Sequence, residues 1–394
     1  MAVIGKNYGK PTLDLNFAGN KSLIDTTTGR NYVTFSRAQS GNEATYVGSD
    51  GLIKYASADE PRFDHDPVTG ESLGLLVEES RTNYLGMFAS PNYNNSNSAT
   101  YSAYSDSRFG ADQNAHSWTY ASAQTNVELG WFNPGSISTT GNGVQYTVSG
   151  WIKANQAYTL RGNLIDERRQ GINFDFDLTT EWQYFSLSTP AGINDDGSGT
   201  VYFRWIRGNI AIPAGLQLDF AAINLERGGF PTSYIPTSGS TVTRAADEAS
   251  ITGTNFSRWY NQSEGTFLVS HDPTGKTGAP RLLGGGSVQN AWIEIFTSNN
   301  YNALRSNTRY NFLDSPDFVS GVPHNVAFAY GTTAGSSVDG QNYTVQGWNV
   351  TDFPESKLNI GRKEGGGEDV SGTISRLTYF PERLPDATLQ AITS

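Results

Sequence analysis

The chain has 394 residues, of which 43 are glycine, 12% are aromatic and only 16% are charged. This turn-rich and weakly charged composition is typical of β-sandwiches. The formal net charge of -11 excludes a generally basic surface, so nucleic acid is not an expected partner, and the absence of cysteine excludes disulfides, thiolate zinc sites and cysteine nucleophiles.

Alternation of apolar and polar residues predicts antiparallel strands along most of the chain. Signals for helices are few: one helix is expected over 386–392, directly after Pro385, and one helical turn over 256–260. The clearest expected strand regions, in chain order, are 13–17, 32–35, two strands around a Pro-Gly turn within 60–83, then 144–152, 201–206 and 216–223.

These elements predict an all-β protein with two antiparallel β-sandwiches and an N-terminal β segment. We place the N-terminal segment at 1–85, the first sandwich at 86–245 and the second sandwich at 246–394. The last boundary follows a stretch rich in Pro, Ser, Gly and Thr. The N-terminal segment could pack into either sandwich.

Several segments resemble structural proteins of tailed bacteriophages. The run from Glu60 to Asn83 is the most distinctive, and the run from Leu225 to Thr237 resembles the closing strand of a carbohydrate-binding jelly roll in such proteins. The resemblance therefore implies a jelly roll in the first sandwich, a concanavalin A/laminin G-like fold in the second and a virion-attachment region in residues 1–85. The segments that resemble strands of a concanavalin A/laminin G-like sandwich are 259–267, 324–330, 337–340 and 358–362.

The resemblance implies a protein of the virion surface, such as a tail fibre or appendage subunit that binds a glycan on the host. Its expected partners are other virion proteins and copies of itself, with a trimer favoured by analogy. The first residues contain no apolar run that resembles a signal peptide, so we expect synthesis in the host cytoplasm. Two alternatives remain: a capsid decoration or purely structural virion protein, and, less favoured, a glycan depolymerase.

Aromatic side chains are the candidate ligand-binding groups, because a flat ring can cover the C–H face of a sugar. Tyr93, Tyr101 and Tyr104 lie in a region rich in Asn and Ser, a composition typical of adaptable recognition surfaces. Trp118 and Trp131 lie near the same region and complete the candidate set. Trp151, within an alternating run, is expected in the core.

Two acidic segments allow either a turn or a calcium site. Around Pro67 and Gly70, the acids at 64, 66 and 71 only partly match a calcium loop, so we favour a tight turn. In the polar loop 194–199, Asp195 and Asp196 are the candidate ligands of a structural calcium, although a plain turn is again favoured. No other cofactor is expected.

No set of residues predicts catalysis. Asp175 and Asp177 share one face of an expected strand, where a solvated face is favoured over an acid pair for glycoside cleavage. Glu294 lacks the neighbouring acids that concanavalin-like hydrolases place on one strand. The four histidines are scattered, without the spacing of a metal motif. We therefore expect a binding protein and not an enzyme.

Overall fold

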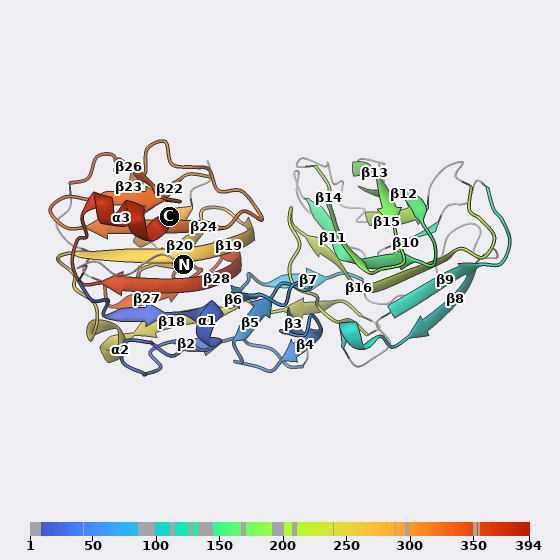
Figure 1. Cartoon of the computed structure of the whole chain (residues 1–394), viewed down its shortest axis with the longest axis horizontal. Helices are drawn as coiled ribbons and strands as arrows, with labels where there is room; N and C mark the ends of the chain where they lie inside the picture. Colours follow the sequence, from blue (N-terminus) through green and yellow to red (C-terminus); the bar gives the residue numbers. More distant parts are fainter. Residues whose placement is uncertain are drawn as a thin grey trace.

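Antiparallel sheets and a few short helices form the protein, which confirms the predicted all-β fold. In Figure 1 the sheets gather in two lobes, one of which holds β19 and β28. No helix within the described ranges is long and apolar enough to cross a membrane. The computed structural model describes residues 9–41, 43–85, 99–110, 115–125, 129–132, 145–166, 171–190, 201–206, 211–238, 240–287, 289–295, 299–349, 353 and 355–394.

The first sandwich takes its strands from the middle of the chain. One sheet has the order β14 (Gln183–Ser188), β11 (Tyr146–Ala154), β16 (Gln217–Arg227), β9 (Ala115–Tyr120) and β8 (Ala99–Tyr104). The facing sheet has the order β10 (Leu129–Phe132), β15 (Val201–Ile206), β12 (Tyr158–Asp166) and β13 (Gly171–Leu178).

The second sandwich combines C-terminal strands with strands of the N-terminal segment. One sheet has the order β26 (Gln341–Tyr343), β25 (Gly335–Val338), β24 (His324–Tyr330), β19 (Gly265–Lys276), β28 (Val370–Phe380), β6 (Ser72–Val77) and β5 (Arg62–His65), and β1 (Leu13–Leu15) also pairs with β28. The other sheet has the order β2 (Thr34–Ser36), β18 (Glu248–Thr252), β27 (Lys357–Ile360), β20 (Arg281–Gly284), β21 (Ala291–Ile295), β22 (Tyr301–Arg305) and β23 (Thr308–Asn311).

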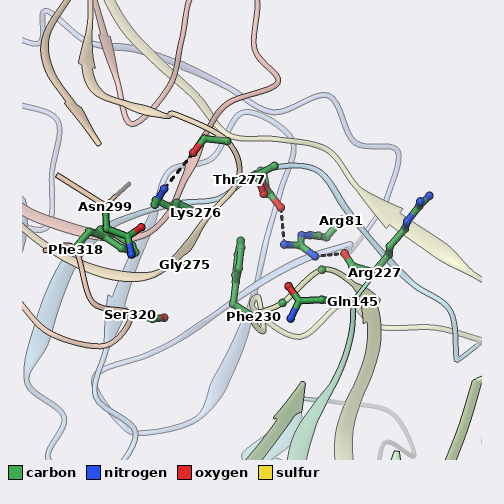
Figure 2. Close-up of a pocket in the computed structure, with 14 residues that line it drawn as sticks. Arg81, Gln145, Arg227, Phe230, Gly275, Lys276, Thr277, Asn299, Phe318 and Ser320 are labelled. Carbon is green, nitrogen blue, oxygen red and sulfur yellow. Dashed lines mark hydrogen bonds and ion pairs between the residues drawn. The ribbon is translucent and has the colours of Figure 1, made fainter. Parts of the chain in front are cut away.

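Short elements join or flank the sandwiches. A ribbon of β7 (Arg81–Asn83) and β17 (Val242–Arg244) connects the lobes, and a hairpin of β3 (Ala44–Val47) and β4 (Ile53–Ala56) lies between them (Figure 1). A cleft of about 980 Å³ opens where the two sandwiches meet (Figure 2). The helices are α1 (Phe17–Asn20), α2 (Gly253–Ser257) and α3 (Asp386–Thr393), and α3 confirms the helix expected after Pro385.

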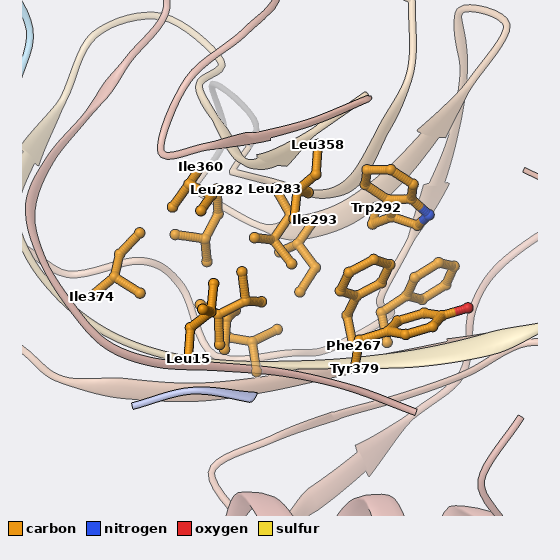
Figure 3. Close-up of a cluster of buried hydrophobic side chains, with 14 of the residues drawn as sticks. Leu15, Phe267, Leu282, Leu283, Trp292, Ile293, Leu358, Ile360, Ile374 and Tyr379 are labelled. Atoms are coloured by element: carbon orange, nitrogen blue, oxygen red, sulfur yellow. The ribbon is translucent and has the colours of Figure 1, made fainter. Parts of the chain in front are cut away.

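Each sandwich has its own apolar core. The core of the second sandwich includes Phe267, Trp292 and Tyr379, and Leu15 from the N-terminal segment packs among them (Figure 3). Trp118, Trp205 and Phe220 lie in the core of the first sandwich. Complete burial of a large apolar side chain contributes ~1.5–3 kcal/mol, so these residues hold the facing sheets together.

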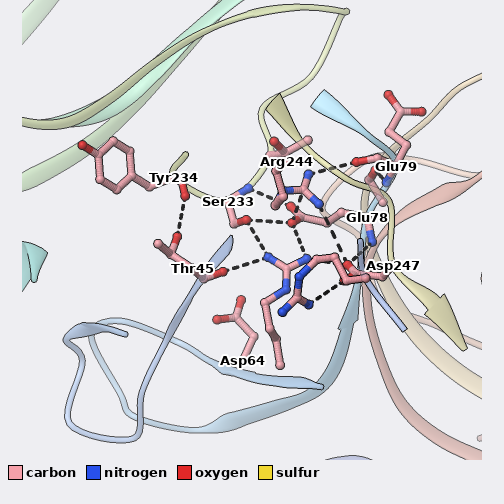
Figure 4. Close-up of polar contacts among 12 residues, drawn as sticks. Thr45, Asp64, Glu78, Glu79, Ser233, Tyr234, Arg244 and Asp247 are labelled. Carbon is pink, nitrogen blue, oxygen red and sulfur yellow. Dashed lines mark hydrogen bonds and ion pairs between the residues drawn. The ribbon is translucent and has the colours of Figure 1, made fainter. Parts of the chain in front are cut away.

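A buried network of charged side chains joins the N-terminal segment to the start of the second sandwich (Figure 4). Asp247 accepts hydrogen bonds from Arg37 at 2.9 Å and from Arg62. Glu78 lies 2.8 Å from Arg62 and 3.4 Å from Arg244. These five side chains are at most 2% exposed. Removal of one partner from such a network leaves an uncompensated buried charge, so the network fixes how these segments meet.

Candidate aromatic cleft

The strongest candidate site is a cleft between the N-terminal segment and the outer face of the first sandwich. Its volume is about 330 Å³. We call it the aromatic cleft, because tyrosine and tryptophan rings from several segments line it. Its principal residues are Tyr46, Asp64, His65, Trp151, Tyr184 and Tyr234.

Trp151 and Tyr184 form the aromatic floor of this cleft. They lie opposite each other on β11 and β14, with ring centroids 5.5 Å apart. Tyr184 is 47% exposed and Trp151 is half-buried. Ile152, the next residue on β11, faces the core instead, as the alternation of a strand requires. Two adjacent rings on an accessible face are a suitable platform for a sugar ring.

A β-bulge in β16 lies beside Trp151. Ser149 pairs with Asn224 and Trp151 pairs with Ala221, so β16 contains one residue more than β11 at this point. Ala222, in the bulge, has a φ of 48°. Such bulges bend a strand and redirect its side chains. Gly150 has a φ of 154°, and a Cβ atom there would lie 3.0 Å from the Ala222 carbonyl oxygen, so glycine is favoured beside the bulge.

Asp64 and His65 lie at the end of β5 and line the cleft. The Val47 N–H donates to Asp64 at 2.6 Å. Nδ1 of His65 donates to the Val47 carbonyl at 3.0 Å. His65 is 4% exposed, and no hydrogen-bond partner for its Nε2 is found among the described residues. Burial raises the pKa of Asp64 to about 6. The cleft therefore combines aromatic faces with acceptors for hydroxyl groups.

Glu78 is the other acid that lines the cleft, but its oxygens are already bonded. The N–H and the hydroxyl of Ser233 both donate to it at 2.7 Å. Burial would raise the pKa of Glu78, yet the guanidinium groups of Arg244 and Arg62 outweigh burial and hold the pKa at about 2. Glu78 is thus a fixed carboxylate within the ionic network.

The aromatic residues predicted for binding do not assemble into one site. Tyr101 lies on β8, where its hydroxyl is 2.8 Å from Nδ1 of His116. Tyr104, on the same strand, packs against the small apolar cluster around Phe109 and does not line the cleft. Trp118 is fully buried in the core, so its predicted role as an exposed platform is wrong.

The other predicted residues are Trp131, Tyr93 and the candidate calcium ligands. Trp131 belongs to β10, whose backbone pairs with β15. Tyr93 and the candidate calcium ligands Asp195 and Asp196 lie outside the described residues. Within the described part of the chain, no group of three or more His, Asp or Glu side chains could hold a metal ion.

The tight turn that the sequence favours around Pro67 and Gly70 is present. Asp66 accepts from the N–H groups of Val68 and Thr69 at 2.8 and 2.7 Å, and the Gly70 N–H donates to the Asp66 carbonyl. Hydrogen bonds of this kind are typical of an Asp that begins a turn. Asp64 is not part of the turn and lines the cleft instead.

The acids considered for catalysis lie elsewhere. Asp175 and Asp177 are on an exposed face of β13, where Asp175 pairs with Arg161 at 2.7 Å, as the solvated-face interpretation predicted. Glu294 is fully buried between Arg281 and Arg309. None of these three carboxylates lines the aromatic cleft.

Sequence reasoning missed the main residues of the cleft. Trp151 was expected in the core, but it lies on the opposite face of its sheet. Tyr184, Asp64 and His65 were not proposed as binding residues. The one available signal was Gly150, a strand glycine that interrupts an alternating run, because such a glycine often marks a bulge.

No protein-family model and no curated protein sequence matches the chain. Partial structural similarity is found to the CBM40 module of a Ruminococcus gnavus IT-sialidase bound to α2,3-sialyllactose (TM-score 0.29, 20% identity, 34% of this chain and 84% of that chain). Domain 4 of a GH43 extracellular arabinanase from Geobacillus stearothermophilus, in complex with arabinotriose, is also similar (TM-score 0.32, 10% identity, 38% of this chain and 73% of that chain). A third similar structure is Trypanosoma rangeli sialidase (TM-score 0.29, 15% identity, 37% of this chain and 25% of that chain). Carbohydrate-binding domains are thus among the structures that parts of this chain resemble.

Proposed function

We propose that this protein is a non-catalytic component of a tailed-bacteriophage virion and binds a glycan of the host surface in the aromatic cleft. The observation that carries the binding proposal is the pair Trp151 and Tyr184 beside the carboxylate of Asp64. The virion part of the proposal is supported by the resemblance of the run Glu60 to Asn83 to phage structural proteins.

The size and chemistry of the cleft suit a terminal sugar. About 330 Å³ lies at the small end of the ~300–1,000 Å³ usual for ligand pockets. A sugar ring laid on Trp151 would release water from both apolar faces, while its hydroxyls donate to Asp64. Because the lining is mainly apolar with a few acceptors, neutral sugars are the expected ligands of this cleft.

The carboxylates of the cleft argue against hydrolysis. Cleavage of a glycoside normally needs one acid as proton donor and a second carboxylate as nucleophile or base. Asp64, with its raised pKa, could donate a proton, but Glu78 is held by Ser233, Arg62 and Arg244. A carboxylate engaged in this way cannot approach a sugar, so we propose binding without cleavage.

The decisive test compares Trp151→Ala and Tyr184→Ala with Tyr343→Ala, which removes a half-buried tyrosine from the second sandwich. A glycan array and adsorption to host cells would identify the ligand, and calorimetry would measure its affinity. We expect each cleft variant to lose about 10- to 100-fold in affinity, because a ring that covers a sugar contributes ~1.5–3 kcal/mol. Tyr343→Ala should bind like the native protein.

Three outcomes would contradict parts of the proposal. Unchanged affinity of both cleft variants would remove the aromatic cleft as the site. Failure to bind any glycan or host cell, with the protein still present in particles, would favour the capsid-decoration or structural alternative. Release of oligosaccharides from host polysaccharide would show an enzyme. We also propose a homotrimer, which light scattering of the purified protein would test, since several weak sites on one particle gain avidity.

A further inference from the structure

The aromatic cleft has an aliphatic wall as well as an aromatic floor. Val47 and Ile53 line it from the hairpin of β3 and β4, where they are direct cross-strand partners and both partly exposed. Side chains opposed in this way lie about 4.5–5.5 Å apart at Cβ and form one apolar surface, which we call the aliphatic pair. Ile53 and Trp151 also pack against the same small cluster around Phe109. The cleft therefore receives apolar groups from two different sheets.

A carboxylate lies next to the aliphatic pair. The Val47 N–H donates to Asp64 at 2.6 Å, and the backbone N–H of His65 also supports the ionised acid. Among the residues drawn in Figure 4, no hydrogen bond or ion pair joins Asp64 to the arginines of the ionic network. A carboxylate has about four acceptor positions, so positions remain for the N–H or O–H donors of a ligand.

A ligand that uses both features needs a donor and an apolar group within one small substituent. A plain hexose has hydroxyl donors but no methyl group, and its hydroxyls lose free energy where they face apolar side chains without a partner. A 6-deoxy sugar has a methyl group but no donor attached to it. An acetamido group has both and remains neutral. In its planar trans amide, the N–H and the methyl group lie on the same side of the C–N bond, and the carbonyl oxygen lies on the other side.

We propose that the aromatic cleft selects N-acetylated amino sugars, with Asp64 accepting the amide N–H and the aliphatic pair contacting the methyl group. The sugar ring lies on Trp151 and Tyr184. This inference rests on the proposed function and names the chemical class of the glycan. Asp64, Val47 and Ile53 then determine specificity, because the aromatic floor accepts the apolar face of many sugars.

The test compares three methyl glycosides of glucose that differ only at C2, which carries an acetamido, an O-acetyl or a free hydroxyl group. The O-acetyl sugar keeps the methyl group but lacks the N–H. The same series is made for galactose and mannose, and ligand-observed NMR measures the affinities. The pKa of Asp64, about 6, leaves this acid ionised at pH ~7.5. In at least one series the acetamido sugar should bind about 10-fold or more tightly than the plain sugar, with the O-acetyl sugar between them.

Two variants separate the donor from the methyl group. Asp64→Asn should reduce the preference for the acetamido over the O-acetyl sugar about 5- to 10-fold, because a charge-assisted hydrogen bond becomes a neutral one. Ile53→Ala should weaken both acetylated sugars about 3- to 10-fold and leave the plain sugar nearly unchanged. Asp177→Asn and Ile24→Ala are the matched controls, because both residues are exposed and lie outside the cleft. Both controls should bind like the native protein.

The outcomes separate this inference from the proposed function. Equal affinity for acetamido and plain sugars in every series, no binding of any acetamido sugar, or a native preference in both cleft variants would overturn the inference. Binding of a glycan without acetamido groups that is lost in Trp151→Ala would keep the proposed function and remove this inference. An acetamido preference that depends on Asp64 but survives Trp151→Ala would keep this recognition and remove the aromatic floor. Thermal melts show whether the variants are folded; if Ile53→Ala is not, Asp64→Asn and the O-acetyl sugar still decide.

Discussion

Two carboxylates that line the same cleft have opposite environments. Glu78 is surrounded by arginines, and its pKa falls to about 2. Its contribution to stability is therefore present above the ordinary pKa of a glutamate and is lost as the pH falls through about 2. For Asp64, burial is the largest influence on the carboxyl group, and it raises the pKa to about 6. The ionised form of Asp64 accordingly costs stability at neutral pH, which is a common property of groups placed for binding.

We predict that Asp64→Asn stabilises the protein at alkaline pH. The folded-state pKa of about 6 exceeds the usual unfolded value of ~3.9, so folding favours the protonated acid and stability falls as the pH rises through this range. Asparagine can still accept from the Val47 N–H. The free energy of unfolding, measured in urea, should rise by ~1–3 kcal/mol at pH ~8, and the gain should disappear near pH ~4.

The exposed Asp177 is the control for this comparison. Asp177→Asn should show no such pH-dependent gain. A gain for Asp64→Asn that is the same at both pH values, or a loss at alkaline pH, would contradict the assigned environment of Asp64.

At the scale of elements, bulges shape both walls of the aromatic cleft. One bulge, at Ala222 on β16, lies beside Trp151. A second occurs on β6, where Asp64 pairs with Gly74 and His65 pairs with Ser72. Each bulge places an extra residue in one strand and increases its bend. Two sheets are therefore locally irregular next to residues that line the aromatic cleft.

We predict that Gly74→Ala is strongly destabilising. Gly74 has a φ of 109°, and a Cβ atom there would lie 2.3 Å from the Ile374 carbonyl oxygen of β28. Strain and steric overlap together should lower the free energy of unfolding by ~2–4 kcal/mol, measured by denaturant titration.

Gly29→Ala provides the matched control. Gly29 has a φ of 71°, but nothing lies within 4 Å of the added Cβ atom. The substitution then costs only the strain of a positive φ in alanine, which should lower the free energy of unfolding by ~1–2 kcal/mol. Equal losses for the two variants would contradict the close approach of β6 to β28.

At the scale of the whole molecule, the N-terminal segment completes the second sandwich. β6 pairs with β28, as does β1, and Asp14 of β1 accepts from Arg376 of β28 at 2.8 and 2.9 Å. Leu13, Leu15, Phe17, Phe35, Leu75 and Val77 belong to the core of that sandwich. The first sandwich, in contrast, takes the strands of its two described sheets from residues 99–227.

We predict that a fragment of residues 246–394 does not fold, whereas a fragment of residues 81–244 does. The first would expose the sheet edge and core surface that the N-terminal strands cover, and burial of that surface is a large part of its stability. Circular dichroism and amide dispersion in NMR spectra would distinguish the two states. Cooperative thermal unfolding of the 246–394 fragment would contradict this dependence.

The sequence determined the class of fold and the local elements, because alternation is a property of neighbouring residues. The runs at 146–152, 201–206 and 217–223 are strands, and a helix follows Pro385. Alternation also predicted that Asp175 and Asp177 share a face that is exposed.

The tertiary structure decided which face of each strand meets another sheet and which distant strands become neighbours. Alternation states only that Trp151 and Ile152 point in opposite directions, and the partner sheet then buries Ile152. The pairing of Leu75 with Ile374 depends on contacts between residues far apart in the chain, which no local pattern encodes. The aromatic cleft consists of such long-range contacts, and for this reason it appears only when the chain is folded.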